Sequence, residues 1–218
     1  MDAEQALDLG DGRAARSEFR WNHGGPADIH GHVARPVVMQ LDRFDARTVL
    51  DLGCGNGWLT AALARCAFDV VGMDCSESGI AIARQTHPDL RFLLGDALQS
   101  AAPELRGRFD AVVAVELVDH VNEPRRLLHH ARDFLRPGGL LLVTAPYHGY
   151  LKNLGLALTN RFDLRLQALE EHGRRKFFSA VTLTALAAEC GFSQLEMHRL
   201  GRIPPLARSM MLSARRAP

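Results

Sequence analysis

The chain has 218 residues, of which 47% are hydrophobic and 23% are charged, which is enough apolar material to bury one sizeable core. This composition excludes wholesale disorder. Lysines and arginines number 26 against 25 aspartates and glutamates, so the formal net charge is +1. Proteins whose main partner is nucleic acid carry a larger positive excess, and the sequence therefore disfavours a general nucleic-acid binder.

The sequence carries no pattern typical of a membrane or targeting segment. No apolar run approaches the roughly 18 residues of a membrane span, so no stable membrane insertion is expected. The first twenty residues are polar and lack the apolar centre of a signal peptide. The four cysteines, Cys54, Cys66, Cys75 and Cys190, form no CxxC pair. We therefore expect a cytoplasmic protein with reduced thiols.

From residue 46 onward, strand-like and helix-like segments alternate, after a short helix expected over residues 29–44. The helices of this region are expected at residues 58–66, 76–85 and 124–135. The strands are expected at residues 48–52, 69–74, 90–94, 109–115 and 140–145. Strands separated by helices imply parallel βαβ units with right-handed crossovers.

Residues 147–178 break this alternation. The stretch is too long for a simple turn and has amphipathic helical spacing, so we expect an inserted cap of the kind that often covers a ligand. A helix over 179–190 and strands over 192–200 and 209–215 complete the expected sheet. The pattern predicts an α/β fold, with a doubly wound, mostly parallel, seven-stranded sheet and helices on both faces.

The strongest motif, VLDLGCGNG, covers residues 49–57, where the first expected strand ends. It places Gly53, Gly55 and Gly57 at alternate positions just before a helix. Glycine is needed where the backbone turns tightly and lies against a ligand, and a helix N-terminus offers free N–H groups. An ordinary strand-to-helix turn is the alternative, which three glycines beside Asp51 disfavour.

Acids also follow the next two expected strands. Asp74 can accept hydrogen bonds from both hydroxyls of a ribose, and Asp96 can accept from the exocyclic amine of an adenine. The alternatives are a helix-capping or solvent-facing acid for Asp74 and an ordinary loop acid for Asp96. Because the glycine spacing is GxGxG and not GxGxxG, a nicotinamide oxidoreductase is the weaker interpretation.

Together these segments resemble the class I S-adenosylmethionine-dependent methyltransferases. VLDLGCGNG, VVGMD and LLGDA resemble that family's first three motifs, while FDAVVAVELVDHV and LRPGGLLLVTAP resemble its fourth strand and the entry to its fifth. The chain is most similar to the small-molecule group that includes the ubiquinone-biosynthesis O-methyltransferases. The resemblance implies a Rossmann-like fold and S-adenosyl-L-methionine as the cofactor.

The resemblance also implies how the cofactor is held. The glycine loop would lie under its methionine part, Asp51 would anchor its ammonium directly or through water, and Asp74 would hold its ribose. Residues 1–45, around Trp21 and His30, would form a lead-in and helix that close over the site in residues 46–218. The full set of expected cofactor-binding residues is Asp51, Gly53, Cys54, Gly55, Asn56, Gly57, Met73, Asp74, Cys75, Asp96, Ala97, Val115 and Glu116.

Methyl transfer from a sulfonium is an in-line displacement, so the protein mainly aligns donor and acceptor and excludes water. A hydroxyl acceptor also needs a base, and ligands of open α/β sheets bind beyond the carboxyl ends of the strands. The candidate catalytic residues there are Glu116, His120 and His148, with Asp119 beside them. The alternatives are a cofactor-orienting role for Glu116, a helix cap for Asp119 and a packed side chain for His120.

The acceptor itself is expected to contact Tyr147, His148, Tyr150 and His172. The basic run at residues 174–176 is either a solvated face or a contact for an anionic substrate group. No metal site is predicted, because the histidines and acids show no usual ligand spacing.

The predicted function is transfer of a methyl group from S-adenosylmethionine to a small organic acceptor, at a hydroxyl oxygen. C- or N-methylation of a small metabolite uses the same cofactor pocket and stays open. A non-catalytic cofactor-binding module on the same fold is a further alternative, against which the intact glycine loop and acids argue.

Overall fold

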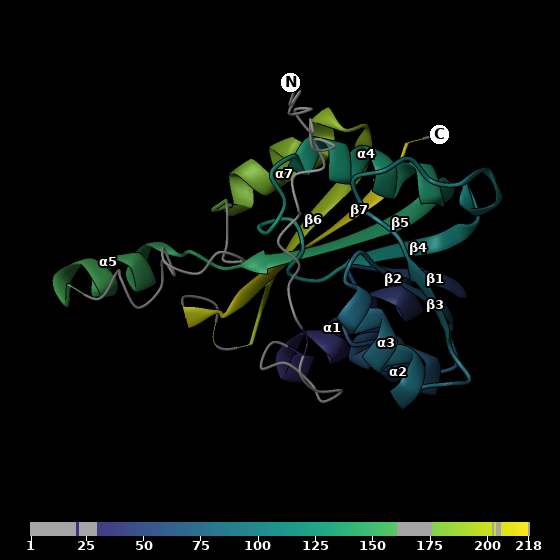
Figure 1. Cartoon of the computed structure of the whole chain (residues 1–218). Coiled ribbons are helices and arrows are strands. Elements are labelled where there is room, and N and C mark those ends of the chain that lie inside the picture. Colours follow the sequence, from purple (N-terminus) through teal and green to yellow (C-terminus); the bar gives the residue numbers. More distant parts are fainter. Residues whose placement is uncertain (1–20, 22–29, 161–175, 202, 204–205, 218) are drawn as a thin grey trace, which may run out of the picture.

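The structure is a computed structural model that describes residues 21, 30–160, 176–201, 203 and 206–217. Its helices and strands alternate along the chain as the sequence predicts (Figure 1). The helices are α1 (His30–Arg43), α2 (Trp58–Arg65), α3 (Glu77–Thr86), the short 3-10 helix η1 (Pro103–Leu105), α4 (Pro124–Phe134), α5 (Tyr150–Leu158) and α7 (Ala180–Glu189). The strands are β1 (Thr48–Leu52), β2 (Asp69–Asp74), β3 (Arg91–Leu94), β4 (Phe109–Ala114), β5 (Leu135–Pro146), β6 (Phe192–Leu200) and β7 (Ser209–Arg216).

The strands of the described chain form one seven-stranded sheet in the order β3-β2-β1-β4-β5-β7-β6. Strands β1 to β5 pair in parallel, whereas β7 runs antiparallel to both of its neighbours, β5 and β6. The short connection from β6 to β7 allows the antiparallel pairing, because only parallel strands need a long crossover. The predicted doubly wound, mostly parallel sheet is confirmed.

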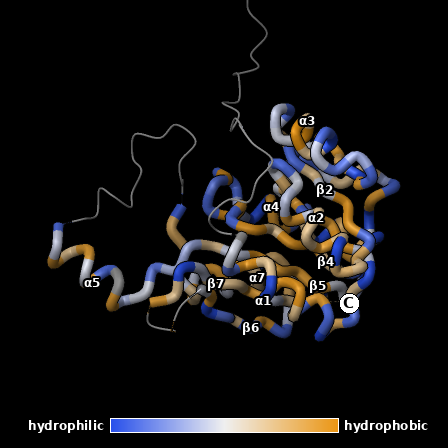
Figure 2. Tube along the Cα trace, turned by 90° about the horizontal axis from the view of Figure 1, so that it is seen from below, coloured by the Kyte–Doolittle hydropathy of each residue, from blue (hydrophilic) through white to orange (hydrophobic). Residues whose placement is uncertain are grey.

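Helices cover both faces of this sheet (Figure 1). Leu50 of β1 packs in one core with Leu127 of α4, and the neighbouring Val49 packs in a second core with Leu63 of α2. The apolar interior is visible along the central strands in Figure 2. Burial on both faces explains the apolar run AVVA within β4, which does not alternate with polar residues. The apolar side of α1 lies in the second core as well, through Val37 and its neighbours.

Strand β5 starts earlier than predicted. The sequence predicts a helix that ends at RPGG and a strand over 140–145, but β5 begins at Leu135, directly after α4. The register with β4 shifts between Phe109 and Ala111, and Gly138 has a φ of +72°. The RPGG segment is therefore an irregular first part of β5. Its proline and glycines are also typical of turns, so the sequence alone does not reveal it as a strand.

The predicted cap at 147–178 is described in part. Helix α5 lies within it and reaches away from the body of the molecule in both views (Figures 1 and 2). Residues 161–175 lie outside the described residues. The far end of the segment returns to the sheet edge, where the backbone N–H of Lys176 donates to the carbonyl of Asp119 at 3.1 Å. No helix in the described parts of the chain is long and apolar enough to cross a membrane.

Candidate active site

The predicted site residues lie side by side at the carboxyl ends of the parallel strands, which we call the carboxyl edge of the sheet. Asp96 follows β3, Asp74 ends β2, the glycine loop at 53–57 follows β1, Glu116 follows β4 and His148 follows β5. These five strands are sheet neighbours in that same order, and adjacent strands lie about 4.8 Å apart. Across the sheet, the residues expected to bind adenine, ribose and methionine thus follow the order of these groups along the cofactor. The residues expected to bind the acceptor come next, beyond the methionine end.

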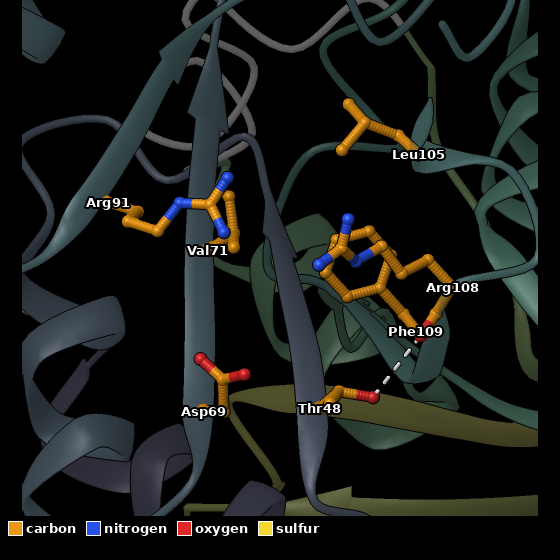
Figure 3. Close-up of a pocket in the computed structure, with 7 residues that line it drawn as sticks. All are labelled: Thr48, Asp69, Val71, Arg91, Leu105, Arg108 and Phe109. Carbon is orange, nitrogen blue, oxygen red and sulfur yellow. Dashed lines mark hydrogen bonds between the residues drawn. The ribbon is translucent and has the colours of Figure 1, made fainter. Parts of the chain in front are cut away.

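A small cavity of about 30 Å³ lies at the amino ends of the strands, opposite the carboxyl edge (Figure 3). Its lining includes Thr48, Asp69, Arg91 and Phe109, which are the first residues of β1, β2, β3 and β4. None of the predicted site residues lines it. Because ligands of open α/β sheets bind at the carboxyl ends, this cavity is not the candidate site.

The glycine loop is fixed to the end of β2. The backbone N–H groups of Gly53 and Cys54 donate to the carbonyl of Met73 at 2.8 and 3.0 Å. Gly57 precedes α2 with a φ of +78°, and a methyl group there would lie 2.7 Å from the ring of Phe92. Only glycine therefore lets α2 start at this point and pack closely.

Asp74 joins the loop to α3. One carboxylate oxygen accepts from the backbone N–H of Gly55 and the other from that of Ser76, both at 2.8 Å. Ser76, where the helix over 76–85 is expected to begin, caps α3 by accepting from Gly79 N–H at 3.0 Å. A carboxylate has about four acceptor sites, so two backbone bonds do not by themselves exhaust Asp74. The rigid loop and the held carboxylate fit the methionine and ribose parts of S-adenosylmethionine.

The residues expected near the adenine differ in exposure. Asp96 and Ala97 are half-buried, and Asp96 accepts from the backbone N–H of Leu98 at 2.8 Å. Cys75 is exposed, whereas Met73 is buried in the core under the edge. Met73 thus contributes packing and its carbonyl oxygen.

Two polar residues of the loop are buried. The Oδ1 atom of Asn56 accepts from the backbone N–H of Trp58 at 3.3 Å, so it helps to start α2. Burial raises the pKa of the Cys54 thiol, which makes it a packed neutral side chain at physiological pH.

Asp51 lies buried beneath the loop, where the hydroxyl of Thr60 donates to it at 2.6 Å. Burial raises the pKa of this carboxyl to about 7, although the bond from Thr60 opposes the shift and the nearby Asp74 adds to it. The group that is expected to anchor the ammonium therefore titrates near neutral pH.

This shift predicts a pH dependence of stability. Asp51 is ionised above pH 4 in the unfolded chain but stays protonated up to about pH 7 in the folded one. The folded state binds more protons in this window, so the free energy of unfolding should fall as the pH rises from 4 to 7, by a few kcal/mol. Urea unfolding of the wild type and of Asp51→Asn across this range measures the difference. If the free energy of unfolding varied with pH in the same way in both proteins, the raised pKa of Asp51 would be contradicted.

Glu116 follows β4 in an unusual backbone conformation, with a φ of +49°. Its backbone N–H donates to the hydroxyl of Thr144 at 2.9 Å, and Thr144 itself is buried in β5. Left-handed conformations of non-glycine residues are costly and cluster at functional sites. The half-buried Val115 and Glu116 thus form a shaped turn between the loop and the end of β5.

Asp119 and His120 lie after this turn. Asp119 is buried, and its Oδ2 atom lies 3.8 Å from Nε2 of His120, whose side chain is 39% exposed. The carbonyl of Asp119 is the acceptor for Lys176, so the same residue contacts both the histidine and the end of the cap segment. The buried carboxylate and the partly exposed imidazole therefore lie within ion-pair distance of each other.

The residues after β5 separate into two groups. His148 is half-buried, with its ring 5.2 Å from that of Phe177, and the Arg199 guanidinium lies 5.2 Å from the ring centre of Tyr147. Tyr150 is 77% exposed at the start of the projecting helix α5. His172 and residues 174–175 lie outside the described residues, and so does the side chain of His30. The structure therefore gathers Tyr147, His148 and the end of the cap at one edge.

Three side chains that support the site are not apparent from motifs. Thr60 bonds to Asp51, Thr144 shapes the turn at Glu116, and Ser78 accepts from the backbone N–H of Trp21 at 3.3 Å. Thr144 is the one with a usable signal, because it is a polar residue inside the apolar run LLLVTAP. Within the described residues, no cluster of three or more histidines, cysteines or acids could hold a metal ion.

Residues 27–196 match a family model described as a methyltransferase domain. The ubiquinone biosynthesis O-methyltransferase of Azorhizobium caulinodans is 33% identical over 175 residues, which cover 75% of this chain and 68% of that protein.

Two solved structures share the fold. The magnesium protoporphyrin IX methyltransferase of Synechocystis PCC 6803, solved with bound SAH, has a TM-score of 0.62 at 23% identity and covers 85% of this chain and 82% of its own. The (4+2)-cyclase SpnF has a TM-score of 0.65 at 19% identity and covers 92% and 86%. The family match spans the glycine loop at residues 53–57, and both observations indicate a methyltransferase. The chain belongs to the methyltransferase domain family and is an S-adenosylmethionine-dependent methyltransferase.

Proposed function

We propose that this protein transfers the methyl group of S-adenosylmethionine to a hydroxyl oxygen of a small organic acceptor. The observation that carries the proposal is the position of Glu116, His120 and His148 beyond β4 and β5, next to the glycine loop in the strand order. The relative named an O-methyltransferase supports oxygen as the atom that is methylated.

In this proposal the protein contributes alignment and proton transfer. The cofactor, when bound, supplies an activated methyl group with a good leaving group. The turn at Glu116 positions the donor end of the site, while Tyr147 and His148 hold the acceptor in line with it. His148, or His120 oriented by Asp119, takes the proton from the acceptor hydroxyl as the new bond forms.

The chemistry favours a phenolic hydroxyl. A phenol has a pKa of about 10, within reach of a histidine base of pKa about 6.5, whereas an aliphatic hydroxyl resists deprotonation much more strongly. A flat ring also suits an edge that carries Tyr147, His148 and Phe177. We therefore propose a phenol or catechol as the acceptor class.

The test is an acceptor screen with S-adenosylmethionine as the donor. Matched phenols, anilines and carbon acids on the same ring are compared, S-adenosylhomocysteine release is measured, and the product is identified by mass spectrometry. An O-methyl ether from the phenols alone is the expected result. N-methylaniline products would instead identify the protein as an N-methyltransferase. Binding of S-adenosylhomocysteine without turnover on any acceptor would favour a non-catalytic module.

A further inference from the structure

Trp21 lies directly on the glycine loop, although it is more than thirty residues away in the sequence. A methyl group on Gly55 would lie 2.1 Å from Cζ2 of the indole, and one on Gly79 would lie 2.9 Å from its Cδ1. The half-buried indole therefore bridges the backbone of the loop and the first turn of α3. Both positions must be glycine for the ring to rest there.

The surface under the indole adjoins Asp74, the residue to which the ribose is assigned. The backbone N–H of Gly55 donates to Asp74, and the hydroxyls of Ser76 and Ser78 lie 3.0 Å apart. Ser78 accepts from the backbone N–H of Trp21 at 3.3 Å. Trp21 is thus joined by a short chain of contacts to both partners that hold the Asp74 carboxylate.

We propose that Trp21 is a cofactor-binding residue whose indole forms the outer wall of the ribose side of the site. The proposal rests on the ribose assignment of Asp74. A large apolar ring on the loop that holds this carboxylate excludes water there, and charge-assisted hydrogen bonds strengthen as the local dielectric constant falls. Docking of the indole and binding of the cofactor therefore favour one another, and this coupling is reciprocal.

Tighter cofactor binding after removal of the indole would indicate competition in place of cooperation. If the indole occupied space that the cofactor needs, the two would compete for Gly55, and removal of the ring would tighten binding. The contacts favour cooperation, because the indole also rests on Gly79 and the backbone N–H of Trp21 donates to the Ser78 hydroxyl, which anchors Trp21 on α3 beside the loop.

The first test is calorimetric titration with S-adenosylhomocysteine. Trp21→Ala should weaken binding about tenfold, which corresponds to a coupling of ordinary size. Trp21→Phe should fall between Trp21→Ala and the wild type, because a smaller ring still covers part of the surface. Melting temperatures of the free proteins show whether the variants are folded. Unchanged or tighter binding by a folded Trp21→Ala protein would overturn the proposal.

The second test measures the reciprocal effect on the indole. The chain has two tryptophans, so Trp58→Phe leaves Trp21 as the single fluorophore. The Trp58 side chain, at the start of α2, packs against the second core and serves as the matched control, with unchanged affinity expected. S-adenosylhomocysteine should shift Trp21 emission to shorter wavelength and reduce its quenching by acrylamide.

An unchanged spectrum at saturating ligand would also overturn the proposal. Failure of the wild type to bind S-adenosylhomocysteine would instead refute the proposed function itself, so the two failures are distinguishable.

Discussion

Replacing Asp74 with alanine should weaken binding of S-adenosylhomocysteine by about 10- to 100-fold, the usual loss for hydrogen bonds to a charged group. The carboxylate has two roles in the structure. It is assigned to the ribose hydroxyls, and it also holds Gly55 and Ser76 through their backbone N–H groups. Its removal takes away a ligand contact and loosens the loop on which the ligand rests. Titration calorimetry measures the change.

Asp69→Ala is the matched control for this experiment. Asp69 is an exposed acid at the other end of β2, beside the small cavity in Figure 3. Its loss changes the net charge of the protein by the same amount but leaves the carboxyl edge of the sheet intact. Equal affinities for the wild type and the Asp74→Ala protein, or equal weakening by both substitutions, would remove the ribose assignment.

The fold could be predicted because its sequence signals are local and consistent. The apolar run of β4 predicts a strand buried on both faces, and Ser76 marks the start of α3 as a helix cap. The prediction was wrong for the start of β5, since the Pro-Gly-Gly composition of that entry is shared with turns. Such ambiguity is resolved only by pairing with β4, which is not local.

The row of site residues could also be predicted, because the carboxyl ends of parallel strands meet at one edge. The supporting contacts could not. The bond of Thr60 to Asp51 and the bond of Thr144 to Glu116 join different elements, and no spacing in the sequence reports them. The same holds for Trp21, whose contacts with Gly55 and Gly79 depend on how an N-terminal residue meets the finished sheet. The sequence pattern identifies candidate site residues, whereas their supporting contacts arise only in the tertiary structure.

The assignment of a base beyond β5 leads to the largest expected effect on turnover. His148→Ala should lower kcat by about 10²- to 10⁴-fold on a phenolic acceptor, the range typical of losing a positioned general base. The Kd of S-adenosylhomocysteine should change little, because His148 follows β5, while the loop and Asp74 belong to β1 and β2. Steady-state kinetics with the acceptor from the screen, together with titration of the cofactor product, separates these two effects.

Packing is the competing explanation for His148, since its ring lies 5.2 Å from that of Phe177 in an edge-to-face arrangement. If the histidine only holds the end of the cap segment, Phe177→Leu should reduce kcat as much as His148→Ala. If it is the base, the wild type and Phe177→Leu proteins should share a rise in kcat/KM with pH that His148→Ala lacks, because the proton acceptor is absent. His129→Ala, which removes an exposed histidine from α4, controls for the loss of an imidazole elsewhere. A pH profile retained by His148→Ala would pass the role of base to the Asp119–His120 pair.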